Sequence, residues 1–174
     1  MKIHTSRFGE LEISQNDILD FAEGLLGFGQ LRRFVLLDDP NDEIFAWLQS
    51  CESPEIAFPV LEPELFAPNY SIDLSSSDLE ALGLKSMGDG RLLTIITIPQ
   101  DPTQMTANMK APIVINPVKR EARQCIVQDN SLQIRELIFA KLQQRVVQFP
   151  NTSLKAKAQA MGAVKIDRPR EIEA

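Results

Sequence analysis

The sequence predicts an all-β protein, a small antiparallel β-barrel-like domain with one or two short helices. Two features favour this class. About seven short apolar runs rich in β-branched residues follow one another at close spacing, and turn-forming residues separate them. The length of 174 residues, with 44% hydrophobic and 24% charged residues, suits a globular chain with a single core.

The N-terminal stretch predicts a hairpin followed by a glycine-rich region. Residues 3–5 and 11–13 alternate apolar and polar side chains around a turn near "RFGE", which is the period of strands with one wet face. Gly24, Gly27 and Gly29 follow among apolar residues. They lack the preceding strand and the following long helix of a phosphate-binding glycine motif, so we expect them to permit tight turns and close packing.

Three strands are predicted between residues 33 and 63. "RFVLLDD" (33–39) and "IFAWLQSC" (44–51) are joined by the turn formers "DPND". Both faces of the second run are mostly apolar, which indicates a strand that is covered on both sides or lines a barrel. "IAFPVLEP" (56–63) is the third, and Pro59 should confine it to an edge or a bulge.

The next segment predicts the clearest helix start and the strongest strand. In "SSSDLEALGL", Ser77 and Glu80 have the spacing of a capping box, and Gly83 provides a stop. "RLLTIITIP" (91–99) is rich in β-branched residues and is closed by a proline. A short helix followed by a long strand is therefore expected here.

Two more strands, "APIVIN" (111–116) and "RQCIVQD" (123–129), precede a stretch with conflicting periodicity. We expect a last strand up to about Leu137 and a helix beyond it. From Asn151 the chain is polar and rich in lysine, which is typical of a mobile tail. The sequence thus predicts a β domain over residues 1–137 and a helical or flexible C-terminal extension over 138–174.

The net charge of −6 is unevenly distributed along the chain. Residues 1–100 carry 6 Lys and Arg against 17 Asp and Glu, a balance of −11, and residues 101–174 carry 12 against 7, a balance of +5. An acidic surface repels nucleic acid and attracts basic partners, so direct RNA or DNA binding by the first 100 residues is not expected. An ordinary solvated face explains the same count equally well.

The sequence predicts a cytoplasmic protein that needs no cofactor. The N-terminus has no apolar run of signal-peptide length, and no window approaches a membrane span. Cys51 and Cys125 are accordingly expected to be reduced packing residues. His4 is the only histidine, so a histidine-based triad has a single candidate, and a lone histidine near the N-terminus is more often a surface residue. Two distant cysteines and one histidine cannot complete a tetrahedral zinc site without carboxylates. We expect no catalytic and no metal-binding residues, and a protein that works by contact.

Five ordered segments carry a resemblance to a known family. They are "FAEGLLGF" (21–28), "FAWLQS" (45–50), "FAPNY" (66–70), "MTANMKAPIVIN" (105–116) and "RQCIVQD" (123–129). Over residues 2–137 the chain resembles the flagellar assembly factor family FliW. Ala22 replaces the proline usual after the first phenylalanine, Leu132 replaces a usual aromatic, and residues 138–174 extend past the usual end of the family.

The resemblance implies a small β-barrel-like protein without enzymatic activity that binds two proteins. One is flagellin, through its C-terminal region, and the other is the RNA-binding translational repressor CsrA, so that accumulating flagellin leaves CsrA free to block flagellin translation. A dedicated flagellin chaperone without a regulatory role is the alternative, and a hydrolase using loop carboxylates is a distant third. No nucleic acid or membrane partner is implied.

Candidate binding residues come from three sources, and each has a structural alternative. Loop acids are expected to be exposed and to steer a basic partner, and aromatic side chains are candidate hot spots unless they belong to the core. The "TAN" segment could present an uncharged strand edge to a peptide, or Thr106 and Asn108 could simply bond their own turn. The candidates are Asp38, Asp39, Asp42, Glu43, Phe45, Trp47, Phe66, Tyr70, Thr106, Asn108 and Asn116.

Overall fold

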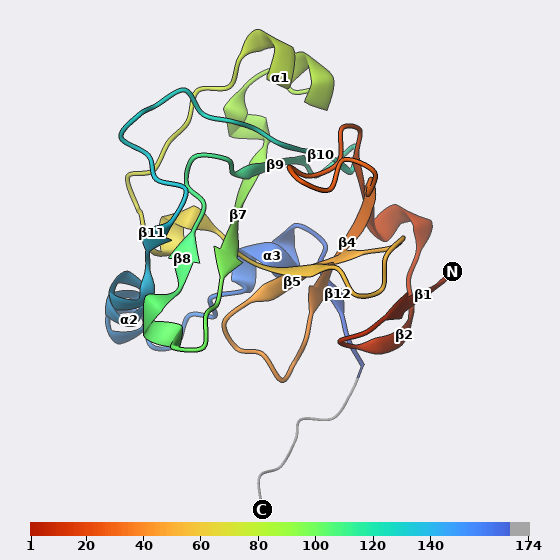
Figure 1. Cartoon of the computed structure of the whole chain (residues 1–174), viewed down its shortest axis with the longest axis horizontal. Coiled ribbons are helices and arrows are strands. Elements are labelled where there is room, and N and C mark those ends of the chain that lie inside the picture. The colour runs from red at the N-terminus through yellow and green to blue at the C-terminus, as the bar shows by residue number, and fades with distance from the viewer. Residues whose placement is uncertain (168–174) are drawn as a thin grey trace, which may run out of the picture.

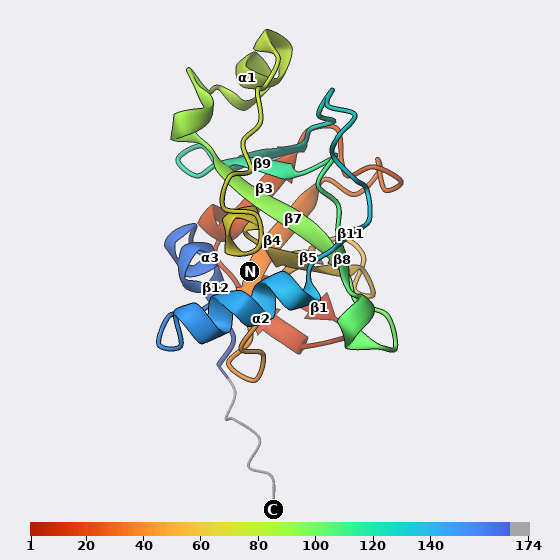
Figure 2. The same ribbon diagram turned by 90° about the vertical axis from the view of Figure 1, so that its left-hand side faces the viewer.

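The computed structural model describes residues 1–167, in which seven strands close into a barrel (Figures 1 and 2). Each strand pairs with the next around the ring, and all of these pairs are antiparallel except the one between β10 and β3. The predicted all-β, barrel-like class is confirmed. In ring order the strands are β3 (Ile18–Phe21), β4 (Arg33–Asp38), β5 (Ala46–Ser50), β6 (Ala57–Leu61), β7 (Arg91–Thr97), β9 (Ile113–Asn116) and β10 (Glu121–Gln124).

Alternation along these strands sends one set of side chains into the barrel and the other set outward. Every barrel strand contributes buried residues to one interior cluster, in which Phe21 and Phe34 meet edge to face with ring centroids 5.2 Å apart. On β5, Leu48 lies in this cluster while Trp47 lies in a second cluster on the outer surface. The predicted double coverage of this strand is confirmed.

The outer surface is covered by elements that lie outside the ring. The expected N-terminal hairpin forms from β1 (Lys2–Thr5) and β2 (Gly9–Glu12), and it buries Ile3 while leaving Lys2 and His4 exposed. Three α-helices, α1 (Ser76–Leu82), α2 (Phe139–Gln148) and α3 (Ala156–Ala160), add to it. Short 3-10 turns are η1 (Gln15–Asp17), η2 (Pro63–Leu65), η3 (Met87–Asp89) and η4 (Pro102–Gln104).

Helix α1 begins two residues earlier than the capping box predicts. Ser75, not Ser77, is the N-cap, and its hydroxyl accepts a hydrogen bond from the amide of Asp78 at 3.0 Å. Three consecutive serines make the register ambiguous, since any of them can cap. The predicted stop is confirmed, because Gly83 ends the helix in the left-handed conformation.

One strand is not predicted from the sequence, and two strand predictions are corrected. The unpredicted strand is β3, whose four residues "ILDF" are too short to show a period. The expected edge position of β6 is wrong, because β6 pairs with β5 on one side and with β7 on the other. However, β7 pairs only with Val60 and Leu61 of this strand. On the side of β7, the sheet therefore needs no N–H donor at Pro59. Of the run 123–129, only Arg123 and Gln124 are strand, and they form the end of β10, which begins earlier, at Glu121.

The expected mobile tail after Asn151 is wrong for the residues up to 167. Helix α3 forms, and β12 (Val164–Lys165) pairs in parallel with β4 through Leu37 and Asp38. Side chains of Ala158 and Met161 join the barrel's interior cluster. The segment is therefore packed against the β domain, and the rest of the predicted extension, 168–174, lies outside the described residues. No helix among residues 1–167 has the length and apolar character needed to span a membrane.

Candidate interaction surfaces

The segment "MTANMKAPIVIN" pairs with one neighbouring strand at both of its ends and bulges outward between them. Its first part, β8 (Thr106–Ala107), and its second part, β9, both pair with β7. Between these pairings, residues 94–95 of β7 face residues 108–112, so two residues oppose five. A bulge of this size turns the strand out of the barrel wall and leaves backbone groups that need other partners.

Side chains and neighbouring loops supply those partners. The Asn108 side-chain oxygen accepts hydrogen bonds from the amides of Lys110 and Ala111 at 3.2 and 3.1 Å. The Tyr70 hydroxyl donates to the Met109 carbonyl at 2.7 Å. The expected use of Asn108 within its own turn is confirmed, and the bulge is fixed in place rather than mobile.

An open strand edge at the "TAN" segment, as the sequence suggests, is not present. β8 is paired on one side with β7 and on the other with β11 (Glu136–Leu137). Asn116 is buried; it donates to the Leu82 carbonyl at 2.8 Å and accepts from the amides of Val118 and Lys119. Backbone pairing with an added peptide strand is therefore blocked at this point.

Tyr70, which bonds the bulge, makes the stability of the folded protein depend on pH. Burial raises the pKa of Tyr70 to about 12 from its usual value near 10, and the nearby Glu136 adds to the shift. The folded state thus holds the phenol proton more tightly than the unfolded state does. The stability that this provides is complete below pH 10 and is lost as the pH rises from 10 towards 12.

Replacing Tyr70 by phenylalanine should lower the free energy of unfolding by about 1 kcal/mol at pH 7, because the Met109 carbonyl loses its donor. The variant should also lose less stability than the parent between pH 10 and 12. Urea unfolding of both proteins at several pH values measures this difference. Titration of Cys51 and Cys125 also changes the stability in this pH range, but both proteins contain these thiols, so their contributions cancel in the comparison. Parallel curves above pH 10 would show that Tyr70 does not titrate on unfolding.

Two of the loop acids are not exposed, contrary to the sequence-based expectation. Asp38 is 3% exposed and Asp39 is 5% exposed. Asp38 forms a buried ion pair with Lys155, and Lys155 also donates to the Asp39 carbonyl at 2.9 Å. The reason is long-range, since a segment more than 110 residues away in the sequence covers the end of β4.

The other two acids of this loop have different surroundings. Asp42 organises the turn, because its carboxylate accepts from the amides of Ile44 and Phe45 and from the Trp47 indole N–H at 2.8 Å. Glu43 is exposed. Of the four acids proposed to steer a partner, Glu43 has the most accessible side chain.

The aromatic candidates are largely core residues. Phe45, Trp47 and Phe66 are 6%, 7% and 3% exposed, as the structural alternative predicts. Trp47 also lies beneath the Arg7 guanidinium, 3.9 Å from the ring centroid. Tyr70 is half-buried and Thr106 is partly exposed, so these two retain some surface.

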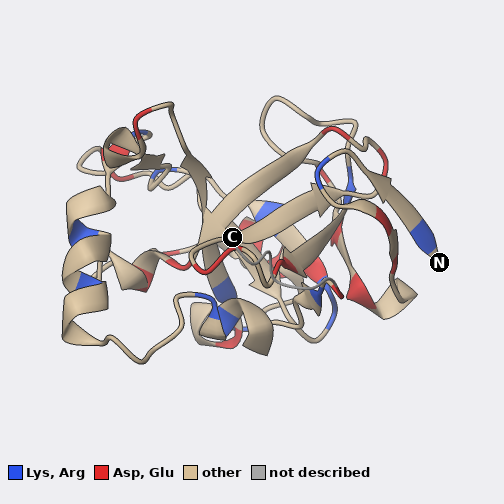
Figure 3. Ribbon diagram, turned by 90° about the horizontal axis from the view of Figure 1, so that it is seen from below, with Lys and Arg blue, Asp and Glu red and all other residues tan. Residues whose placement is uncertain are grey.

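A cluster of three carboxylates at one end of the barrel binds two lysines of the C-terminal segment. We define this "acidic end" as Asp38, Glu62 and Glu64. Lys155 pairs with Asp38, and Lys157 pairs with Glu62 at 2.8 Å and with Glu64. Burial raises the pKa of Glu62, while Lys157 opposes that shift. Figure 3 shows a short helix with a basic stretch beside acidic segments of the backbone.

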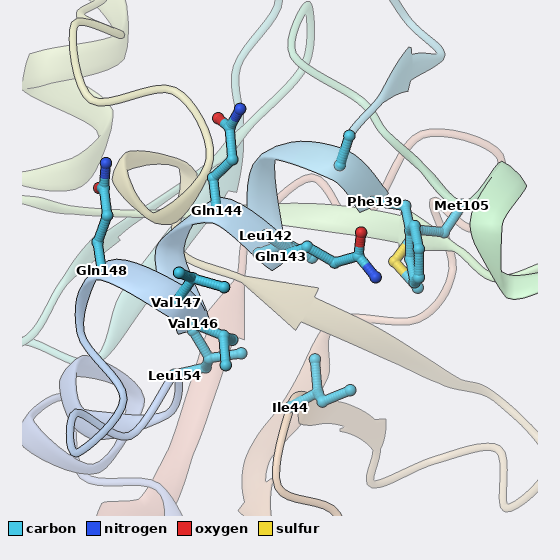
Figure 4. A pocket seen from close by; sticks show the side chains of 11 residues that line it. Ile44, Met105, Phe139, Leu142, Gln143, Gln144, Val146, Val147, Gln148 and Leu154 are labelled. Carbon is cyan, nitrogen blue, oxygen red and sulfur yellow. The ribbon is translucent and has the colours of Figure 1, made fainter.

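An apolar groove of about 950 Å³ runs along α2 (Figure 4). Val146 and Val147 of this helix are 49% and 79% exposed, an unusual degree for aliphatic side chains. Most of the lining follows residue 138 in the sequence. Its main apolar residues are Ile44, Met105, Phe139, Leu142, Val146 and Leu154.

Among residues 1–167, no three His, Cys, Asp or Glu side chains are placed to share a metal ion. Cys51 and Cys125 are free thiols, and burial raises their pKa values to about 11 and about 12. Thiols of this kind carry little thiolate at neutral pH and are poor nucleophiles.

Comparison with known proteins identifies the family. A sequence model described as FliW protein matches residues 2–138. The flagellar assembly factor FliW of Bdellovibrio bacteriovorus is 60% identical over 174 residues, covering 99% of both chains. That of Leptospira biflexa is 38% identical over 143 residues, covering 82% of this chain and 94% of its own.

A solved structure agrees with the sequence matches. The crystal structure of a flagellar assembly factor FliW superposes with a TM-score of 0.74 at 36% identity, and the match covers 80% of this chain and 97% of that one. The matched region includes the barrel and the bulge, both of which precede residue 138. The chain therefore belongs to the FliW family.

Proposed function

We propose that this protein acts in flagellar assembly in the cytoplasm, where it binds the C-terminal region of flagellin and antagonises the translational repressor CsrA. The observation that carries the proposal is the match to proteins named flagellar assembly factor FliW, one of them at 60% identity over almost the whole chain. In this role the protein works by binding, without catalysis and without a cofactor.

The charge distribution supports contact with a basic repressor. A protein that binds RNA is basic where it holds phosphates, and residues 1–100 of this chain carry a balance of −11. Opposite charge accelerates association, and once docked the acidic chain repels incoming RNA through its field. This favours mixed or non-competitive antagonism over direct imitation of RNA.

The groove along α2 is not assigned to either partner. Most of its lining lies beyond residue 138, where the family match ends, so the binding that is common to the family does not depend on it. The acidic end is different, because Asp38, Glu62 and Glu64 all lie within the matched region. Surfaces within residues 2–138 are therefore the better candidates for family-wide contacts.

Identifying the partners recovered from cell extract distinguishes a regulator from a dedicated flagellin chaperone. The full chain, immobilised, should retain flagellin and an RNA-binding repressor; flagellin alone would favour a dedicated chaperone. A titration with labelled flagellin C-terminal peptide, with and without purified CsrA, then tests whether the two proteins exclude each other. Failure of both to bind at micromolar concentration would refute the proposal.

Steering by the β4–β5 loop is tested by charge reversal at Glu43. Glu43→Lys should slow association with CsrA roughly threefold at low salt, and the difference should vanish at high salt. Glu80→Lys, on α1 at the opposite end of the molecule in Figure 1, changes the net charge equally and should have a smaller effect. Stopped-flow fluorescence of both variants gives the rates. Equal slowing would mean that the overall field acts, not the loop.

A further inference from the structure

The C-terminal segment, residues 150–167, docks on the acidic end through side chains that match it in charge. Lys155 is only 7% exposed, and it places its ammonium group between the Asp38 carboxylate and the Asp39 carbonyl. Gln159, one turn further, donates to the other Asp38 oxygen at 2.8 Å. Lys157 binds both Glu62 and Glu64. Three barrel carboxylates are thus satisfied by one short segment.

Backbone pairing extends this contact along β4. The strand β3 pairs with β4 only as far as Val35, and β12 takes the next positions, Leu37 and Asp38. The amide of Ile166 also donates to the Asp38 carbonyl at 2.9 Å. The segment therefore adds a short strand to an edge that the barrel itself leaves open, which is a recurring way for a peptide to bind a sheet.

Some relatives match this chain without the segment, whereas the Bdellovibrio bacteriovorus protein matches it over 99% of both chains. The match to the Leptospira biflexa protein spans 94% of that chain but only 82% of this one, and the family match ends at residue 138. The match to the solved FliW structure likewise spans 97% of that chain but only 80% of this one. The solved structure shows that a barrel of this kind forms without a matched counterpart of the segment.

The connection to the segment is exposed. Residues 150–153, between α2 and Leu154, are all solvent-exposed. Two backbone hydrogen bonds involve this stretch: the Thr152 amide donates to the Phe149 carbonyl at 3.2 Å, and the Ser153 carbonyl accepts from the Ala156 amide at 3.3 Å. Such a linker holds the segment beside its surface at an effective concentration in the millimolar range. Covalent attachment, as well as contact, thus contributes to docking.

We propose that the acidic end is a docking surface for a lysine-bearing segment of a basic protein partner, and that residues 150–167 occupy it in cis as an exchangeable competitor. The identity of the trans partner rests on the proposed function, with CsrA as the basic protein. The docking surface itself does not rest on that function. Its chemistry is defined by carboxylates spaced to receive two lysines two residues apart and by an open strand edge next to them.

Exchange of the segment is tested with the full chain carrying a specific protease site between residues 150 and 153. After cleavage, a fluorescent synthetic peptide of residues 150–167 is added, and its anisotropy reports binding. We expect saturable binding to the cut chain and at least tenfold weaker binding to the uncut chain. A peptide with Lys155→Gln and Lys157→Gln should bind at least tenfold more weakly. A peptide with Lys165→Gln, whose side chain is exposed, should bind within about twofold of the parent.

Three results of this experiment would overturn the proposal. Retention of the cut segment through gel filtration without exchange for excess peptide would make the segment an integral part of the fold. Loss of the circular dichroism signal from the cut chain would do the same. Equal binding of the doubly substituted peptide would show that the lysines do not direct docking. Each of these readouts is independent of flagellin and CsrA.

Competition with the partner is measured separately. Cutting the chain and diluting out the segment should strengthen CsrA binding at least fivefold, and the added 150–167 peptide should reverse that gain. Equal CsrA affinity of cut and uncut chains would overturn the competitor role while leaving the proposed function intact. If neither form binds CsrA or flagellin, the proposed function fails, and peptide exchange alone decides whether the docking surface exists.

Discussion

Phe34→Ala lowers the free energy of unfolding by about 3–5 kcal/mol, the cost of a large cavity in a packed interior. Phe34 is fully buried in the barrel and packs edge to face on Phe21, so truncation removes both apolar burial and a favourable ring contact. The barrel wall limits how far the neighbouring side chains can move into the space, because seven hydrogen-bonded strands enclose it.

The measurement is urea denaturation followed by far-UV circular dichroism, with the m-value checked for both proteins. Phe149→Ala is the matched control: the same side chain, 47% exposed at the end of α2, should cost less than about 1 kcal/mol. A loss below about 1.5 kcal/mol for Phe34→Ala, at an unchanged m-value, would mean that the barrel interior is not closely packed around this ring.

Gly24→Ala lowers the free energy of unfolding by at least about 2 kcal/mol, through two additive causes. The residue has a φ of +67°, where an L-residue is strained by about 1 kcal/mol or more. A Cβ there would also lie 2.7 Å from the backbone atoms of Phe28 and Gly29. Backbone atoms cannot rotate away as a side chain can, so the whole loop between β3 and β4 must shift.

Gly27→Ala shows the first cause alone, so the difference between the two variants isolates the second. Gly27 has a φ of +84° in the same loop, but a Cβ there meets nothing within 4 Å. Its replacement should cost only about 1 kcal/mol, from backbone strain alone. Thermal unfolding of the two variants under identical conditions measures the difference. Similar midpoints for both would indicate that the loop relaxes around the added methyl group.

Local patterns in the sequence identified most of the strands correctly. The strand β7 is anticipated from its run of β-branched residues, and the stop of α1 from Gly83. The strand that ends at Leu137 and the helix beyond it are also confirmed, as β11 and α2, although β12 is a later strand. These features depend on residues that are close together in the sequence, so the sequence alone is enough to predict them.

The candidate residues illustrate the limit of this approach. The use of Asn108 within its turn is local and was foreseen, whereas the burial of Asn116 against the Leu82 carbonyl joins residues 34 positions apart. The proposed roles of these residues in binding flagellin or CsrA stay predictions. What burial establishes is that Asp38, Asp39 and Asn116 act first on folding, so their replacement is a poor test of binding.

The sequence by itself determined the fold class, the alternation that gives each strand an inner and an outer face, and the glycine turns. Only the tertiary structure decided that β10 closes the barrel against β3 and that Lys155 buries Asp38. The physical reason is separation along the chain: about 100 residues lie between β3 and β10, and 117 between Asp38 and Lys155. No periodicity encodes such pairings, because they arise when burial of the whole core and the matching of opposite charges select one arrangement among many.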